Sequence, residues 1–114
     1  MKQIYVVGIG PGSYEQMTIK AAEILKSCDL IVGYTVYVDL IKEYFPDKEM
    51  MTTPMKKEVE RCRLAFEEAD KGKDVAMICS GDAGVYGMAG LMYEIGTEYS
   101  DCRITVVPGV TAAV

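Results

Sequence analysis

The fold of this chain is decided by one stretch, Cys79-Ser80-Gly81-Asp82-Ala83-Gly84-Val85-Tyr86-Gly87. It follows one apolar run and opens another, which is the order of a strand, a glycine-rich turn and a helix. Such a turn leaves backbone N–H groups uncovered, and they point beyond the carboxyl end of the strand. The stretch therefore predicts a ligand-binding loop in an α/β fold.

Two further Gly/Pro turns follow apolar, strand-like runs in the same way. They are Gly8-Ile9-Gly10-Pro11-Gly12 and Pro108-Gly109-Val110-Thr111-Ala112. We expect the three loops to converge on one edge of a sheet, where open α/β folds bind their ligands.

Predicted strands and helices alternate along the whole chain. The strands cover 3–7, 29–33, 48–52, 74–79 and 103–107, with 48–52 as a weak edge strand, and the helices cover 18–27, 34–44, 55–71 and 84–99. This alternation predicts an α/β fold with a five-stranded parallel sheet, right-handed crossovers and helices on both faces.

The helices carry apolar stripes and end signals. Thr18 is expected to cap the first helix and Gly72 to end the third. The predicted inward stripe of the first helix is Ala21, Ala22, Ile24, Leu25 and Cys28. In the third helix Val59, Cys62, Phe66 and Ala69 are expected to face inward, with Glu58, Arg61, Glu67 and Glu68 mostly off that face.

Composition excludes several function classes. A chain of 114 residues with net charge -5 fits one domain and argues against nucleic acid as the main partner. Apolar runs are too short for a membrane span and no signal peptide opens the chain, so we expect a cytoplasmic protein with no membrane partner. With no histidine and four scattered cysteines, neither a metal site nor an imidazole-activated nucleophile is expected.

The first loop fits a dinucleotide fingerprint only in part. Gly8 and Gly10 match, but Ser13 stands at the third glycine position and no acidic residue ends the second predicted strand. The alternative is that these glycines only permit tight turns. Asp82 has two readings of equal weight, a helix N-cap or an acceptor for a small polar ligand. Tyr86 is expected to be a packed aromatic residue rather than a catalyst.

Taken together, the three loops resemble in order the three signatures of the tetrapyrrole methylases, S-adenosylmethionine-dependent enzymes of the corrin and sirohaem pathways. Residues 81–87, with Val32-Gly33-Tyr34-Thr35-Val36-Tyr37-Val38-Asp39, are most similar to the branch that methylates carbon 17 of precorrin-3B and assists ring contraction in cobalamin biosynthesis. The resemblance spans essentially the whole chain.

The resemblance implies a two-domain enzyme whose N-terminal α/β domain is residues 1–114, with a second domain, outside this chain, completing the cleft. It also implies a homodimer. The cofactor contacts that it implies are Pro11, Ser80, Gly81, Asp82, Val85, Thr111 and Ala112. On the substrate side we place Gly10 and Gly12 of the first loop.

Three further residues are assigned to the substrate as hypotheses. Some relatives have an aspartate after the second strand, where this chain has Tyr34, so Tyr34 is expected to donate a hydrogen bond to the substrate in its place. The substrate is a polycarboxylate, and Lys56 and Lys57 lie just past the third strand at the correct edge. The alternative for both lysines is a solvated helix start, which the sequence favours slightly.

Other functions stay open at this point. One is another corrin-pathway methylase of the same family. Another is a non-catalytic, doubly wound module that binds a small ligand, because fold does not fix function. A nucleotide-dependent oxidoreductase is opposed by Ser13 and by the missing acidic residue.

Overall fold

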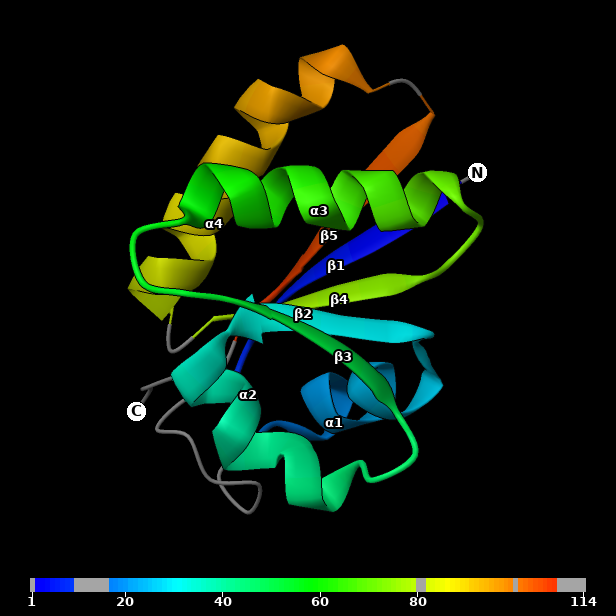
Figure 1. The fold of residues 1–114 in the computed structure, drawn as a ribbon, viewed down its shortest axis with the longest axis vertical. Coiled ribbons are helices and arrows are strands. Elements are labelled where there is room, and N and C mark those ends of the chain that lie inside the picture. Colours follow the sequence, from blue (N-terminus) through cyan, green and yellow to red (C-terminus); the bar gives the residue numbers. More distant parts are fainter. Residues whose placement is uncertain (1, 10–16, 80–81, 100, 109–114) are drawn as a thin grey trace.

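Five parallel strands form one sheet in the order β3-β2-β4-β1-β5 (Figure 1). The structure is a computed structural model that describes residues 2–9, 17–79, 82–99 and 101–108. The strands are β1 Lys2–Gly8, β2 Leu30–Tyr34, β3 Glu49–Thr53, β4 Val75–Cys79 and β5 Cys102–Val107. The predicted five-stranded parallel sheet is confirmed, including the edge position of β3.

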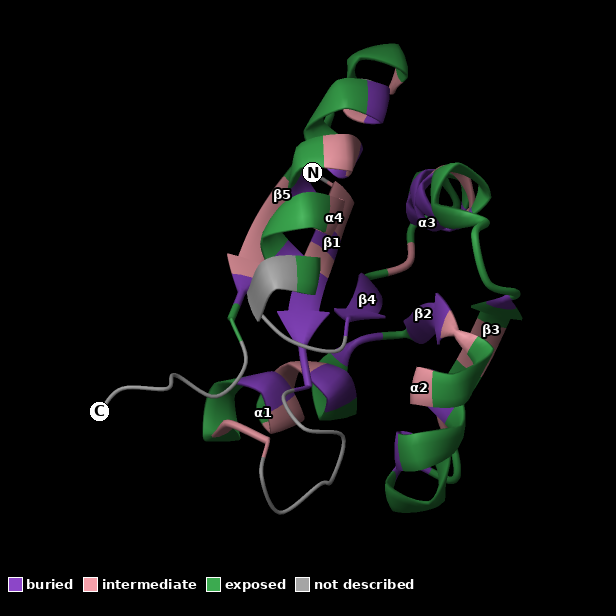
Figure 2. Cartoon of the chain, turned by 90° about the vertical axis from the view of Figure 1, so that its left-hand side faces the viewer, coloured by how far each residue is buried: buried purple, intermediate pink, exposed green. Residues whose placement is uncertain are grey.

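Helices cover both faces of the sheet, as predicted. The helices are α1 Ile19–Ser27, α2 Thr35–Ile41, α3 Glu58–Asp70 and α4 Asp82–Ile95, with short 3-10 turns at Lys42–Tyr44 and Gly96–Glu98. Helices α3 and α4 lie on one face, and α1 and α2 lie on the other (Figures 1 and 2). No helix in the described part of the chain is long and apolar enough to cross a membrane.

Each face of the sheet has its own apolar core. Alternate residues of a strand point to opposite faces, so Ile4 and Val6 pack under α3 and α4 while Val7 packs with α1 and α2. Phe66 of α3 and Leu25 of α1 are fully buried in the two cores. The two layers fix the helices relative to the carboxyl ends of the strands, where the site lies.

Two predicted helix-end signals, one at the start of α1 and one at the end of α3, are confirmed by the structure. The hydroxyl of Thr18 accepts a hydrogen bond of 3.1 Å from the N–H of Ala21 and so caps α1. Gly72 has a φ of +95°, which permits the turn that ends α3. Of the inward stripe predicted for α1, Ala21, Leu25 and Cys28 are buried, and the other two members are half-buried.

The structure corrects several details. Tyr86, which was expected to be packed, is 57% exposed on α4. Helix α4 begins at Asp82 rather than Gly84, and α3 begins at Glu58, after the predicted start. Val59 was expected to face inward, but it is 47% exposed in the first turn of α3, ahead of the buried positions. Arg61 and Glu68, expected off the buried face, are only 6% and 4% exposed. Both are buried because neighbouring polar groups provide their hydrogen bonds.

Candidate functional site

The sheet opens at its carboxyl edge between β2 and β4. The β2–β4 ladder ends at the pair Val32–Met77, whereas β2 stays paired with β3 as far as Tyr34–Thr53. The chain then leaves β2 for a helix on one face and leaves β4 for a helix on the other (Figure 2). This divergence creates the crevice at which open α/β sheets bind ligands.

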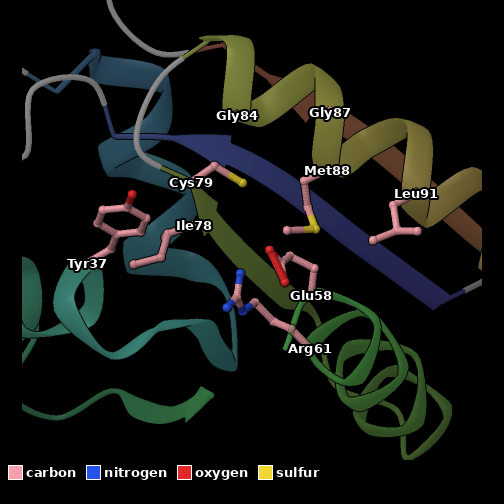
Figure 3. A pocket seen from close by; sticks show the side chains of 9 residues that line it. All are labelled: Tyr37, Glu58, Arg61, Ile78, Cys79, Gly84, Gly87, Met88 and Leu91. Carbon is pink, nitrogen blue, oxygen red and sulfur yellow. The ribbon is translucent and has the colours of Figure 1, made fainter. Parts of the chain in front are cut away.

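A pocket of about 320 Å³ occupies this crevice. Its walls come from α2, from the first turn of α3, from the end of β4 and from α4 (Figure 3). The lining residues are Tyr37, Glu58, Arg61, Ile78, Cys79, Gly84, Gly87, Met88 and Leu91.

The α4 wall of the pocket combines exposed backbone with apolar side chains. Gly84 and Gly87 line it, and a Cβ added to Gly87 would meet no atom within 4 Å. A ligand can therefore approach the helix backbone closely at this point. Met88 and Leu91 continue the wall along α4 and provide an apolar surface for a flat or aliphatic group.

A second pocket, of about 210 Å³, lies next to the first. It is lined by Tyr34, Tyr37, Met55, Lys56, Glu58 and Arg61. Tyr37, Glu58 and Arg61 line both pockets. We call the two pockets together the carboxyl-edge cleft.

Tyr34, the predicted substrate donor, lies in this cleft. It is half-buried at the N-cap of α2, and its ring meets Tyr37 edge-on, with 5.3 Å between centroids and 85° between planes. The guanidinium carbon of Arg61 lies 6.0 Å from the Tyr34 centroid. These contacts hold the Tyr34 ring at the wall of the second pocket.

The two predicted lysines differ in position. Lys56 lines the second pocket and has a φ of 68°, a left-handed conformation that costs a non-glycine residue about 1 kcal/mol or more. Lys57 precedes the first turn of α3 and pairs with Glu60 at 3.3 Å. Lys56 is therefore the better placed of the two to meet a ligand in the cleft.

Arg61 is a cleft residue that the sequence reasoning missed. Its Nε donates to the hydroxyl of Thr53 at 2.6 Å, and its Nη2 donates to the carbonyl of Pro54 at 3.5 Å. The sequence predicted an exposed position because Arg61 is charged and was expected to lie mostly off the inward face of the helix. Its position next to Cys62 on the inward side of α3 was the available signal.

The two thiols near the larger pocket, Cys79 and Cys62, have low reactivity at neutral pH. Burial raises the pKa of Cys79 to about 12 and that of Cys62 to about 11. Both thiols therefore stay protonated at neutral pH, and a thiolate is the form that attacks or binds metals. Cys62 instead packs its Sγ 3.5 Å from the Sδ of Met88.

Among the remaining predicted contacts, the structure describes the side chain of Val85 only. Val85 is fully buried in the core under α4, so its side chain does not line either pocket. The others lie outside the described residues: Gly10, Pro11, Gly12, Ser80, Gly81, Thr111, Ala112 and the side chain of Asp82.

The strands that carry the three predicted loops are neighbours. In the sheet order, β1 lies between β4 and β5. The carboxyl ends of the three strands are in register, with Gly8 opposite Cys79 and Val7 opposite Val107. The ends of the three strands therefore lie side by side at one edge of the sheet, as the predicted convergence of the loops requires; most residues of the loops themselves lie outside the described part of the chain.

Comparison with known proteins matches this arrangement. The family model described as "Tetrapyrrole (Corrin/Porphyrin) Methylases" matches residues 3–114. A probable cobalt-factor III C(17)-methyltransferase of Salmonella typhimurium is 46% identical over 110 residues, which is 96% of this chain and 46% of that protein.

Solved structures agree. The methyltransferase CobJ superposes with a TM-score of 0.82 at 31% identity, over 98% of this chain and 48% of that one. A uroporphyrin-III C-methyltransferase of Thermus thermophilus, complexed with S-adenosyl homocysteine, superposes with a TM-score of 0.72 at 27% identity, over 96% of this chain and 46% of that one. The chain thus spans about half the length of these relatives. It belongs to the tetrapyrrole (corrin/porphyrin) methylase family.

Proposed function

We propose that this chain is the N-terminal half of an S-adenosylmethionine-dependent methyltransferase that acts in the cytoplasm. The reaction is methylation of carbon 17 of a precorrin-3B or cobalt-precorrin-3 macrocycle, with ring contraction, in cobalamin biosynthesis. The observation that carries the proposal is the match, along nearly the whole chain, to a relative named for C(17) methylation. The carboxyl-edge cleft supports it with a site of suitable shape.

Residues 80–82 and helix α4 would hold the methyl donor. The open backbone at Gly87 fits close approach of a ligand, and the apolar wall at Met88 and Leu91 fits its non-polar parts. The thermophilic relative's complex with S-adenosyl homocysteine supports the same cofactor. Further contacts are proposed from Pro11, Ser80, Gly81, Asp82, Thr111 and Ala112. When bound, S-adenosylmethionine supplies a methyl group on a sulfonium.

The protein's contribution is mainly to position the two reactants. Methyl transfer from a sulfonium is an in-line displacement, so holding the acceptor carbon in line supplies much of the acceleration. A polar group is still needed to orient or deprotonate the macrocycle. In this proposal Tyr34 donates a hydrogen bond to the macrocycle from the second pocket, and a C-terminal domain and a homodimeric partner complete the enzyme.

The test is isothermal titration of S-adenosylhomocysteine into this chain and into the two-domain protein. We expect tight binding to the two-domain protein, weak binding to the chain alone, and a clear loss of affinity in Asp82→Ala. Asp39→Ala is the matched control, because Asp39 lies on α2 in an ion pair with Lys42. No binding to either wild-type protein would contradict the proposal.

A further inference from the structure

Arg61 is a buried cation without a buried anion to match it. The residue is only 6% exposed and lines both pockets of the carboxyl-edge cleft; Figure 3 shows it at the wall of the larger pocket. Its contacts are a hydroxyl of Thr53, a carbonyl of Pro54 and the ring of Tyr34, all of them neutral. Among the described residues, no carboxylate forms an ion pair with it.

The other buried charged residue of α3, Glu68, has its counter-charges, and so does the half-buried Arg63. Glu68 is 4% exposed and is paired with both Lys71 and Lys73. Arg63 makes a two-pronged contact with the carboxylate of Glu98, at 3.0 and 3.1 Å. A buried charge is costly unless it is paired and hydrogen-bonded. The exception at Arg61 therefore indicates that its counter-charge arrives with a ligand.

The geometry leaves part of the guanidinium available. The hydrogen bonds within the described chain use Nε and Nη2 and leave Nη1 without one. The hydrogen bond to Thr53 fixes the plane of the guanidinium group. An incoming carboxylate therefore meets N–H donors that are already oriented.

Glu58 is the alternative partner. It stands one turn before Arg61 on α3 and lines the same two pockets, and its side chain points into the larger one (Figure 3). Its carboxylate makes no ion pair with Arg61 in this structure, although a rotation of the side chain could bring the two together. Any test of Arg61 must therefore include Glu58.

We propose that Arg61 is a substrate-binding residue that receives a peripheral carboxylate of the macrocycle. The inference rests on the proposed function for the identity of the ligand. The methyl donor also has a carboxylate. We assign Arg61 to the macrocycle because the second pocket, which Arg61 lines with Tyr34 and Lys56, has no lining residue from α4, the helix assigned to the methyl donor. Arg61 then selects for acidic macrocycles and fixes their orientation in the cleft.

The first measurement uses the two-domain protein and uroporphyrin, a fluorescent polycarboxylate macrocycle that needs no catalysis. We expect Arg61→Met to weaken uroporphyrin binding roughly 10- to 100-fold, the value of a lost charged hydrogen bond, and to change S-adenosylhomocysteine affinity less than twofold. Arg63→Met removes the same charge from the same helix and should change neither. Unchanged uroporphyrin binding, or a loss confined to S-adenosylhomocysteine, would overturn the proposal.

The second measurement is thermal unfolding without ligand. Replacing a buried cation that has no counter-charge by an apolar side chain of similar length removes the cost of burying the charge. Arg61→Met should therefore melt at or above the wild-type temperature, and Glu58→Gln should melt unchanged. If both variants are destabilised and the double variant is no worse than either, Glu58 is the counter-ion and the proposal fails. If the wild type transfers no methyl group but shows Arg61-dependent porphyrin binding, only the proposed function fails.

Discussion

Gly33 lies directly under the side chain of Ile78: a Cβ on Gly33 would be 2.5 Å from Cγ1 of Ile78 and 3.2 Å from Cγ2 of Val38. Gly33 follows the last paired residue of β2 with β4, and Ile78 lines the larger pocket. The absence of a side chain at Gly33 therefore lets Ile78 fill the place where the two strands diverge.

Gly33→Ala is expected to destabilise the domain by about 1–3 kcal/mol, the usual cost of an overpacked core. Gly90→Ala is the matched control, because a Cβ on Gly90 meets no atom within 4 Å and the residue is exposed within α4. That control should instead stabilise by about 0.5–1 kcal/mol, the difference in helix propensity. Urea unfolding followed by circular dichroism measures both, and equal effects of the two substitutions would refute the packing argument.

The sequence predicted the fold well because the fold depends on short-range patterns. Apolar runs of strand length alternate with helical stripes, and each run became a strand of the sheet. Thr18 and Gly72 act within three or four residues of their own positions, so their roles could be read without knowledge of the tertiary structure. Helix boundaries were less predictable, because residues 54–57 enter α3 through the left-handed turn at Lys56.

The sequence predicted where the cleft lies, but it did not predict that Arg61 is buried there. The burial of Arg61 depends on Thr53 from β3 and on Tyr34 from β2, which the sequence separates from it. The burial of Glu68 likewise depends on Lys73, beyond the end of the helix. A charged residue on a helix is expected to be exposed unless such partners are known, so helical position alone was not enough to predict the burial of either residue.

Glu68 gives the stability a defined dependence on pH. Its carboxylate accepts hydrogen bonds from Lys71 and Lys73, both at 2.8 Å, and these two ammonium groups hold its pKa below the usual range. The folded pKa is lower than the unfolded one, so the stabilisation is present above the unfolded value of about 4.3 and is lost as the pH falls through the folded pKa.

Glu68→Gln should therefore be less stable than the wild type at pH 7, and the difference should shrink towards pH 3. Denaturant unfolding at both pH values checks this. Glu67→Gln, at an exposed neighbouring position, is the control and should show little change at either pH. A difference between Glu68→Gln and the wild type that does not depend on pH would mean that packing, rather than charge, sets the effect.

The four cysteines should react at very different rates. Burial raises the pKa of Cys28 and Cys62 to about 11 and that of Cys79 to about 12. At pH 8 a thiol with a pKa near 11 is ionised to roughly one part in a thousand. Burial also raises the pKa of Cys102, but this residue is only half-buried on β5.

Iodoacetamide at pH 8 should consequently modify Cys102 first, and the other three thiols should react at a useful rate only after denaturation. Peptide mass spectrometry over time measures the order, and Cys102→Ser should remove the fast phase. Modification of Cys79 as fast as that of Cys102 would show that the pocket wall is more open than the structure indicates.

Tyr34→Phe tests the proposed hydrogen bond to the substrate. The variant keeps the ring, and therefore the contacts with Tyr37 and Arg61, and removes only the hydroxyl. In the two-domain protein we expect turnover to fall by about 2- to 10-fold, the value of one neutral hydrogen bond, with S-adenosylhomocysteine affinity unchanged. Tyr93→Phe, exposed on α4, is the control. Wild-type turnover in Tyr34→Phe would end the hypothesis.

Substitutions of Lys56 and of Lys57 should have different effects on the KM for the macrocycle. Lys56 lines the second pocket, whereas Lys57 is paired with Glu60, so the positive charge that a substrate carboxylate meets is that of Lys56. Lys56→Asn removes this charge with a residue that tolerates the left-handed backbone at φ 68°. We expect the KM for the tetrapyrrole to rise roughly 1.5- to 5-fold, the range of a solvent-exposed charge pair, with cofactor affinity unchanged. Lys57→Gln should leave both constants unchanged, and the double variant should match Lys56→Asn. If the double variant also keeps the wild-type KM, both lysines belong to a solvated helix start, and any recognition of acidic side chains from this domain depends on Arg61.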